Sequence, residues 1–333
     1  MYRAAVIGCG RIGFVFDEDP KRRYPATHVA AYSRVDRVEL AAVCDLNREL
    51  VDKCATKWGI PAGYTDLGEM LSKEKPDIVS ICTPPETHSN ILKTVVKHKG
   101  IKGIFCEKPL AATVEEAKEM DRACRERGII LQVGHQRRFD PLHLNIRESI
   151  MGGKFGNLQQ GNFYYTAGIR NTGSHMFDIL RFFFGEVEWV EAFFSRNISR
   201  KEKDPNLDGV LRFKNGFFAT FQACDVNDYL IFEFNGLFEK ARLVLKDSGF
   251  SVDFYEAGES ENYSGYRELK KTASPFQENY QRNFMVNAVE HLLECIKKSD
   301  QSISSGYDGA KDVELIENSI LSAEDGGRKI FLS

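Results

Sequence analysis

The chain of 333 residues lacks the features that mark several large classes of protein. No apolar run approaches the roughly 18 residues that cross a membrane, and the first residues do not have the layout of a signal peptide. Basic residues are not in excess, because the chain has 45 Lys and Arg and 48 Asp and Glu. Binding to nucleic acid by phosphate neutralisation is therefore not expected. We therefore expect a cytoplasmic protein that binds neither membranes nor nucleic acid.

The eight cysteines form no C-x-x-C pair, which argues against a zinc knuckle or a thioredoxin motif. Cys44, Cys82 and Cys106 stand at the ends of apolar runs, where cysteine behaves as a small buried hydrophobe. A disulfide framework is untypical of so long a chain. We predict reduced, structural cysteines, with Cys9 in a glycine loop as a partial exception, and we expect no metal site.

The first half of the chain alternates short apolar runs with amphipathic segments, which predicts a parallel, doubly wound α/β sheet. Strands are predicted at residues 3–7, 38–44, 78–82, 103–106 and 129–133. Helices are predicted at residues 29–33, 48–58, 67–72, 89–97 and 114–127. The last of these helices has an N-cap in Thr113 and ends at Gly128.

The first predicted strand leads into a G-x-G-x-x-G fingerprint, made of Gly8, Cys9, Gly10, Arg11, Ile12 and Gly13. The first two glycines allow a tight turn and a close approach of the backbone to a pyrophosphate, and the third lets helix and strand pack. Backbone N–H groups then bind the phosphates. We therefore predict that Gly8 and the residues from Gly10 to Gly13 contact a dinucleotide.

Asp45 follows the second strand, where a carboxylate accepts hydrogen bonds from the ribose hydroxyls of NAD and repels a 2′-phosphate. It stands 32 positions after Gly13, beyond the usual separation of about 20. We interpret the polar stretch 17–23 as a loop inserted before the first helix. Arg48 keeps NADP possible, and the alternative that Asp45 is only a turn residue stays open.

Polar residues also follow the later strands, at the edge where doubly wound folds bind ligands. Two prolines after Thr83 hold a rigid loop, and Lys108 stands between Glu107 and Pro109, which restricts its backbone. Lys108 would place an ammonium at a fixed position in the cleft, although a surface lysine is the alternative. His135 and Arg138 follow the fifth strand.

The second half predicts an α+β domain with a sheet of strands joined by short turns. Strands are predicted at residues 155–165, 187–194, 217–223 and 229–235, and helices at 141–151, 172–184, 278–298 and 309–324. Leu230, Phe232 and Phe234 are expected on one face of their strand. The strand at 217–223 is apolar on both faces, so one face pairs with a second subunit or is covered by loops.

Together these residues resemble the Gfo/Idh/MocA family (glucose-fructose oxidoreductase, inositol dehydrogenase and rhizopine catabolism proteins). The resemblance runs from Arg3 through the glycine fingerprint, Asp45, Thr83–His88 and Glu107-Lys108-Pro109 to residues 138–141, resumes at 173–185, and is weak at 322–326. It implies an NAD(P)-binding Rossmann domain, placed at residues 1–134, and a substrate and oligomerisation domain with a large open, mostly antiparallel sheet at 135–333. It also implies a homodimer or homotetramer and places Thr83, Pro84, His88, Glu107 and Arg138 near the cofactor.

Oxidation of a secondary alcohol by nicotinamide requires a base and a positive group that steadies the alkoxide. The resemblance assigns His175 as the base and Lys108 to the substrate hydroxyl and the nicotinamide ribose. Asp178 and Asn171 lie three and four positions from His175 on a predicted helix, so either can orient its imidazole. Family members usually have Asp where this chain has Asn171, and asparagine cannot stabilise an imidazolium by charge.

Arg170 is predicted to bind a carboxylate or phosphate of the substrate. His28, His98, His143 and His291 belong to no recognisable group and are interpreted as surface or packing residues.

The sequence thus predicts an NAD-dependent oxidoreductase that acts on a sugar, cyclitol or sugar-nucleotide-like hydroxyl. The alternatives are a cofactor-binding sensor without turnover, which Asn171 favours, and non-redox sugar chemistry through a transient ketone.

Overall fold

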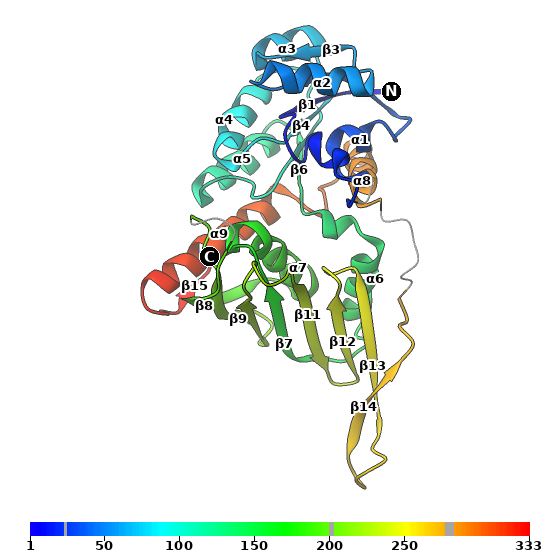
Figure 1. Cartoon of the computed structure of the whole chain (residues 1–333), viewed down its shortest axis with the longest axis vertical. Coiled ribbons are helices and arrows are strands. Elements are labelled where there is room, and N and C mark those ends of the chain that lie inside the picture. The colour runs from blue at the N-terminus through cyan, green and yellow to red at the C-terminus, as the bar shows by residue number, and fades with distance from the viewer. Residues whose placement is uncertain (23–24, 200–202, 277–282) are drawn as a thin grey trace. The chain divides into compact units, whose positions relative to one another are not determined.

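The computed structural model describes residues 1–22, 25–199, 203–276 and 283–333, and it divides the chain into two compact units. The first unit comprises Met1–Asp140 together with Arg282–Val313, and the second comprises Pro141–Gln281 together with Glu314–Ser333. Each unit therefore contains two separate segments of the chain, whereas the sequence predicts one cut after residue 134. Each unit is described on its own (Figure 1).

The first unit is built on a six-stranded parallel sheet with the order β3-β2-β1-β4-β5-β6. Its strands are β1 (Tyr2–Ile7), β2 (Val38–Cys44), β3 (Ala62–Tyr64), β4 (Ile78–Ile81), β5 (Gly103–Cys106) and β6 (Ile130–Val133). This is the strand order of a dinucleotide-binding Rossmann sheet. The predicted fold class is confirmed, and β3 is the strand of this sheet that the sequence does not predict.

Helices cover both faces of this sheet. They are α1 (His28–Tyr32), α2 (Arg48–Trp58), α3 (Leu67–Glu74), α4 (Pro85–Val95), α5 (Val114–Arg125) and α8 (Phe284–Lys298). Apolar side chains of α3, α4 and α5 share one core cluster with the sheet, and those of α1, α2 and α8 share the other. The sequence predicts the segment 278–298 as a helix of the second domain. The structure instead packs α8 on the Rossmann sheet, while residues 278–282 lie outside the described part.

The second unit contains a nine-stranded sheet with the order β14-β13-β12-β11-β7-β10-β9-β8-β15. Its strands are β7 (Leu158–Tyr165), β8 (Val187–Phe194), β9 (Leu207–Phe213), β10 (Phe218–Ala223), β11 (Phe232–Phe238), β12 (Ala241–Lys246), β13 (Ser251–Glu259), β14 (Arg267–Thr272) and β15 (Ile330–Phe331). Neighbouring strands are antiparallel except β7 and β10, which are parallel. The large, mostly antiparallel sheet implied by the resemblance is therefore present.

Aromatic side chains dominate the core between this sheet and its helices, α6 (Pro141–Met151), α7 (Ser174–Phe184) and α9 (Gly306–Glu324), the last of which begins in the first unit. The ring of Phe177 in α7 stands edge-on to Phe221 of β10 at 5.3 Å. Phe184, at the end of α7, packs in the same way against Phe213 of β9 at 6.1 Å. These contacts fix α7 along the sheet, and α7 is the helix that carries His175.

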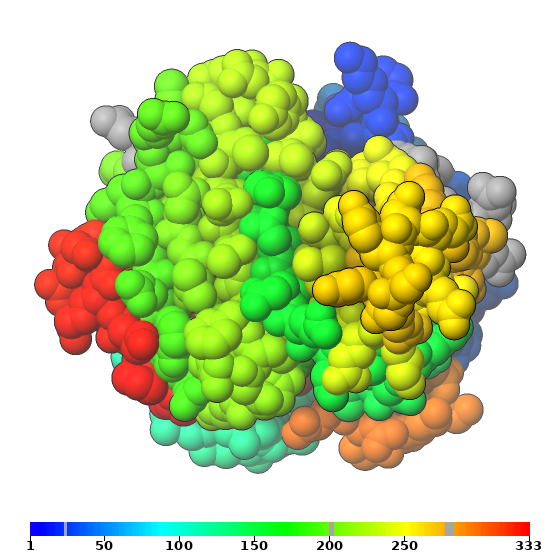
Figure 2. Space-filling model, turned by 90° about the horizontal axis from the view of Figure 1, so that it is seen from below, coloured from blue at the N-terminus to red at the C-terminus, as the bar shows by residue number. Residues whose placement is uncertain are grey.

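The opposite face of this sheet exposes several large apolar side chains (Figure 2). Phe193 of β8 and Phe218 of β10 point to this face and are 49 % and 37 % exposed. Phe218 also receives the guanidinium of Arg212 on its ring at 4.4 Å. The predicted strand at 229–235 begins only at Phe232, so the expectation that Leu230 shares its buried face is wrong: Leu230 is 63 % exposed.

Among the described residues, no helix is long and apolar enough to cross a membrane.

Candidate functional site

The glycine fingerprint forms the turn that follows β1. Gly8 has a φ of +97°, and a Cβ atom there would lie 2.8 Å from the carbonyl carbon of Cys82. At Gly13 a Cβ would lie 1.9 Å from the carbonyl oxygen of Gly8, so both positions require glycine. Gly10 differs, because no neighbouring atom lies within 4 Å of the place that its Cβ would take. The space beside Gly10 is what a pyrophosphate needs to approach the backbone.

The other two residues of the fingerprint shape the same turn. Arg11 is exposed, and its guanidinium lies 4.8 Å from the ring centre of Phe16. Ile12 is half-buried, and its carbonyl accepts from the backbone N–H of His28 at 3.1 Å. Within the described part of the chain, no acceptor binds the backbone N–H of Arg11 or Ile12. Both groups fit an anion-binding turn.

The insertion predicted after the fingerprint is present, and described residues on either side of it are joined by hydrogen bonds. Val15–Glu18 form a short 3₁₀ helix, and the carboxylate of Asp17 accepts from the backbone N–H of Ala26 at 2.8 Å and from the hydroxyl of Thr27. Thr27 then caps α1. The first helical N–H groups donate to Ile12 and Gly13, so the insertion returns the chain to the glycine loop. Residue 23 of the predicted loop lies outside the described residues.

Asp45 directly follows β2 and holds two turns together. One carboxylate oxygen accepts from the backbone N–H of Cys9 at 2.7 Å, and the other accepts from that of Asn47 at 2.8 Å. An ionised carboxylate has about four acceptor sites, so this half-buried group retains capacity for ribose hydroxyls. Arg48 is exposed and pairs with Asp52 at 2.9 Å. Its assignment to NADP stays a prediction.

All eight cysteines are free, and seven of them are buried. Cys9 lies beneath the glycine loop, where a hydrogen bond with Cys54 and burial raise the pKa of its thiol far above the ordinary value. It therefore stays a protonated thiol rather than a reactive thiolate. In the described residues, no three His, Cys, Asp or Glu side chains are arranged to hold a metal ion.

The turn after β4 leads directly into α4. Pro84 is the N-cap and Pro85 is the first helical residue, so the helix begins four positions before the predicted one. His88 lies inside this helix and is completely buried. Its Nε2 lies 2.8 Å from the carbonyl oxygen of Thr83, and its Nδ1 lies 3.1 Å from that of Leu110. Burial lowers the pKa of His88, and the residue joins the turns after β4 and β5.

The Glu-Lys-Pro segment (Glu107-Lys108-Pro109) continues directly from β5, and its Lys108–Pro109 peptide bond is cis. The backbone N–H of Glu107 donates to the carbonyl of Ile81 at 2.9 Å, which extends the pairing of β5 with β4 by one residue. Its carboxylate is buried and accepts from the backbone N–H of Lys108 at 3.3 Å. Lys108 itself is half-buried at the carboxyl edge of the sheet, where the sequence predicts it.

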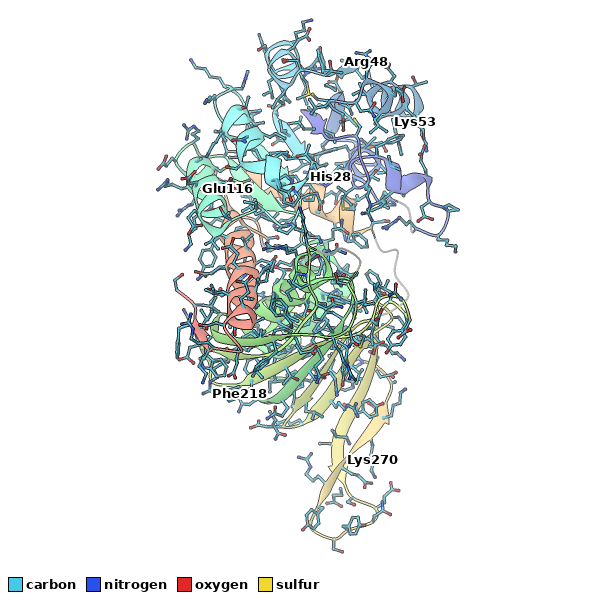
Figure 3. All side chains as sticks on the ribbon, turned by 60° about the vertical axis from the view of Figure 1, so that its left-hand side comes forward. His28, Arg48, Lys53, Glu116, Phe218 and Lys270 are labelled. Atoms are coloured by element: carbon cyan, nitrogen blue, oxygen red, sulfur yellow. The ribbon has the colours of Figure 1, made fainter. Side chains whose placement is uncertain are left out.

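His28 is the residue of this region that sequence reasoning missed. Its Nε2 lies 2.8 Å from Oε1 of Glu107, and its Nδ1 lies 2.9 Å from Oγ of Ser80 in β4 (Figure 3). The imidazole is fully buried and packs against the ring of Phe105 at 4.4 Å. No local pattern could have found it, because Ser80 and Glu107 are 52 and 79 residues away along the chain.

Arg138 and His135 follow β6, and both side chains are buried inside the first unit. The guanidinium of Arg138 pairs with Asp308 at 2.9 Å and donates to the carbonyl of Ile303 at 2.6 Å. His135 lies 3.2 Å from the hydroxyl of Ser304. Arg138 therefore ties the chain after β6 to the segment before α9, and its contact with the cofactor stays a prediction.

In the second unit, the predicted substrate residues lie at the start of α7. Residues Ile169–Gly173 form a single π-helical turn, a feature frequent at functional sites, and α7 follows directly. Asn171 is exposed and His175 is half-buried, while Asp178, one turn further on, is buried. The structure therefore places Arg170, Asn171 and His175 on one continuous helical segment.

A second residue that the sequence did not single out is Asp204. Its carboxylate oxygens accept from the backbone N–H groups of Arg170 at 2.7 Å and Asn171 at 3.1 Å. Gly168 has a φ of +94°, and a Cβ there would lie 2.2 Å from Oδ2 of Asp204. A buried carboxylate thus caps the π-helical turn on which Asn171 stands. Asp204 stands 33 positions after Asn171, so sequence analysis could not find this contact.

Two groups of predicted residues are therefore assembled, one in each unit. The glycine loop, Asp45, Thr83 and the Glu-Lys-Pro segment follow β1, β2, β4 and β5 and share the carboxyl edge of the parallel sheet. Arg170, Asn171 and His175 share the start of α7. The first group fits a dinucleotide, since the space at Gly10, the N–H groups of Arg11 and Ile12 and the carboxylate of Asp45 match what the cofactor requires.

Comparison with known proteins gives matches in both units. Residues 2–135 match the family model described as an oxidoreductase family with an NAD-binding Rossmann fold, and residues 159–236 match the GFO/IDH/MocA C-terminal domain. D-apiose dehydrogenase of Paraburkholderia graminis is 25 % identical over 98 % of this chain and 88 % of its own. The scyllo-inositol 2-dehydrogenase (NAD⁺) of Bacillus subtilis is 31 % identical over 52 % of this chain and 45 % of its own.

Solved structures share the whole fold. A levoglucosan dehydrogenase in complex with NADH and L-sorbose superposes with a TM-score of 0.82, covers 100 % of this chain and 99 % of its own, and is 17 % identical in sequence. At that identity the likeness concerns the fold.

Proposed function

Because the chain belongs to the Gfo/Idh/MocA family of NAD-binding oxidoreductases, we propose that it oxidises a secondary hydroxyl of a sugar- or cyclitol-like substrate, or reduces the matching ketone. The observation that carries this proposal is the half-buried Lys108 at the carboxyl edge of the sheet that also bears the glycine loop and Asp45. Relatives named as D-apiose and inositol dehydrogenases support the substrate class.

Lys108 and His175 divide the chemistry in this proposal. The ammonium of Lys108 binds the substrate hydroxyl and the nicotinamide ribose, and its charge favours the alkoxide. His175 accepts the hydroxyl proton as general base. NAD⁺, when bound, would supply the acceptor for the hydride. Arg170 and Asn171 bind the remainder of the substrate. Gly8, the residues from Gly10 to Gly13, Asp45, Thr83 and Pro84 hold the cofactor.

Turnover is tested with a panel of D-apiose, inositols, levoglucosan and sugar nucleotides, followed by NADH absorbance. Lys108→Met should lower kcat by at least about 100-fold while the Kd for NADH stays within a few-fold. Lys102→Met is the matched control, because Lys102 lies just before β5 and pairs with Asp77 at the surface. Turnover that survives in Lys108→Met would overturn the role of Lys108.

Asn171 supports a second candidate, a cofactor-binding sensor without turnover, because its amide lacks the negative charge that the usual family residue supplies. NADH binding with no activity on the panel would favour this candidate. Substrate conversion without net NADH production would instead favour sugar chemistry through a transient ketone.

Self-association through the open face of the second unit's sheet belongs to the same proposal. Phe193 and Phe218 expose apolar area there, and such patches mark interaction surfaces. Phe193→Glu should shift the molar mass measured by light scattering from that of a dimer or tetramer toward that of a monomer. The eight free cysteines further support a place in the reducing cytoplasm.

A further inference from the structure

A chain of buried hydrogen bonds runs from α1 to the Glu-Lys-Pro segment within the first unit. The hydroxyl of Tyr32 lies 2.8 Å from Oγ of Ser80, and Ser80 lies 2.9 Å from Nδ1 of His28. Nε2 of His28 lies 2.8 Å from Oε1 of Glu107, whose Oε2 accepts from the backbone N–H of Lys108. Tyr32, Ser80 and His28 are at most 1 % exposed, so water does not compete for these bonds.

A neutral imidazole satisfies every contact in this chain. Nε2–H of His28 donates to Glu107, and Nδ1 accepts from the hydroxyl of Ser80, which in turn accepts from Tyr32. The carboxylate of Glu107 then receives one donor on each oxygen, from His28 and from Lys108. The side chain of Glu107 is further confined by Gly134, where a Cβ would lie 2.7 Å from Oε1.

The chain of hydrogen bonds is suited to holding a position and not to conducting protons. Its far end is the buried hydroxyl of Tyr32 on α1, the helix to which His28 itself belongs. His28 and Val29 also donate their backbone N–H groups to Ile12 and Gly13 of the glycine loop. His28 therefore contacts the glycine loop through its backbone and Glu107 through its side chain.

We propose that His28 is a positioning residue of the Glu-Lys-Pro segment. By holding Glu107, it fixes the backbone that carries the ammonium of Lys108. Because the backbone of His28 is hydrogen-bonded to the glycine loop, it also fixes the position of that segment relative to the loop. The importance of Lys108 rests on the proposed function, whereas the hold of His28 on the segment does not. Misplacement of a reacting group by about 1 Å can cost about 100-fold in rate, so this hold has a measurable consequence.

Two substitutions of His28 separate positioning from packing. The amide nitrogen of a glutamine occupies the place of Nε2, so His28→Gln keeps a donor toward Glu107. The amide of an asparagine reaches only the place of Nδ1, so His28→Asn keeps the contact with Ser80 and loses the one with Glu107. Both variants remove the ring from Phe105, and asparagine also leaves a larger cavity than glutamine. His28→Leu, which is close to glutamine in volume but has no donor, is therefore the packing control: packing alone predicts that it behaves as His28→Gln, and positioning predicts that it behaves as His28→Asn.

Hydrogen–deuterium exchange of the full chain tests the inference without any substrate. We expect the peptide that contains Glu107 and Lys108 to exchange at least about 10-fold faster in His28→Asn than in His28→Gln, with the sheet peptides of β1 and β2 unchanged. Equal exchange of this peptide in the two variants, or exchange as slow as in the native chain in both, overturns the inference. Far-UV circular dichroism and the Tm of each variant identify global unfolding, and His28→Leu, which also lacks a donor toward Glu107, replaces His28→Asn if the latter does not fold.

Activity provides the second measurement wherever the panel yields turnover. We expect kcat of His28→Asn to fall by about 10- to 100-fold, kcat of His28→Gln to stay within a few-fold of native, and the Kd for NADH to change little in either. If Lys108→Met keeps full turnover while exchange still separates the two His28 variants, the proposed function fails and the positioning by His28 stands. If exchange of this peptide is equal in the two His28 variants while Lys108→Met is inactive, the proposed function stands and the positioning by His28 fails.

Discussion

Asp45 combines two tasks at the scale of a single side chain. Its oxygens hold the backbone of Cys9 and of Asn47, and the same carboxylate faces the position expected of the ribose hydroxyls. Asparagine keeps one acceptor for the Cys9 N–H but removes the charge, whereas alanine removes both. The two substitutions therefore distinguish loop anchoring from recognition of the cofactor.

Asp45→Ala should weaken NADH binding by about 10-fold or more, since hydrogen bonds to a charged group contribute about 1.5–3 kcal/mol. Asp45→Asn should keep the Tm close to native and lose most of its discrimination against NADPH. Fluorescence titration with both cofactors measures this. Native affinity of Asp45→Ala for NADH would refute the assignment of Asp45 to the cofactor.

The burial of His88 predicts how the free energy of unfolding depends on pH. Burial lowers the pKa of His88 and of His291, so below the ordinary pKa of about 6.5 the unfolded chain binds protons that the folded chain does not. The contribution of these two histidines to the free energy of unfolding should therefore be constant above pH 7 and fall as the pH is lowered from 7 to 5.5. Urea titrations at several pH values measure the slope. A slope unchanged by His88→Gln would show that His88 does not contribute to it.

The positions of Asp45 and Lys108 could be predicted from the sequence because each directly follows an apolar strand. The partners of these residues could not. His28 comes from a helix after an insertion and Asp204 from a distant segment, and each acts through contacts that span tens of residues. Asn171 is visible in the sequence, but the carboxylate that caps its turn is not.

At the scale of elements, the glycines of the turn after β1 have different roles. Gly13 is required by the fold, because a Cβ would collide with Gly8, while Gly10 borders open space. The two positions should therefore respond differently to the same added methyl group.

Gly13→Ala should lower the Tm by several degrees and weaken NADH binding with it, because the turn and its carbonyl at Gly8 must shift. Gly10→Ala should leave the Tm within about 2 °C of native, an effect within about 0.5 kcal/mol, and still weaken NADH binding at least several-fold by obstructing the pyrophosphate. Differential scanning fluorimetry with and without NADH measures both. A Gly10→Ala variant with native affinity would contradict the placement of the pyrophosphate.

Elements with strong apolar runs were predicted within a few residues, as β2 and α2 show. The short β3 has no buried residue, and the strands β13 and β14 carry many polar and exposed positions. Such strands form because a neighbouring strand supplies hydrogen-bond partners, and sequence periodicity does not report that. The start of α4 at Pro85 was missed because two prolines suggest a loop, although proline also suits the first turn of a helix.

At the scale of the whole molecule, the first unit, which carries the glycine loop and Asp45, includes α8, a helix from a distant part of the chain. Met285, Ala288, Val289 and Leu292 are completely buried in its core. A cut of the sequence after residue 134 or 140 would expose that face of the sheet.

Leu292→Ala should destabilise the first unit by about 2–5 kcal/mol, although Leu292 lies more than 150 residues beyond β6. The loss should appear as faster hydrogen exchange of β1 and β5 and a lower midpoint in urea. Leu321→Ala in α9 is the control, because Leu321 is 45 % exposed. Equal destabilisation by both would argue against the specific role of α8.

The split of both units also governs how the nascent chain acquires its structure. The ribosome releases residues of α8 roughly ten to thirty seconds after those of β6, at about 5–20 residues per second. During that interval the sheet of the first unit lacks its α8 cover, and the second unit still awaits its last segment. Folding of the two units is thus completed only after α8 and α9 have been synthesised. A gene rearrangement that copied the first 140 codons would transfer an unfinished module, so exchange of cofactor domains between such genes requires two coordinated junctions.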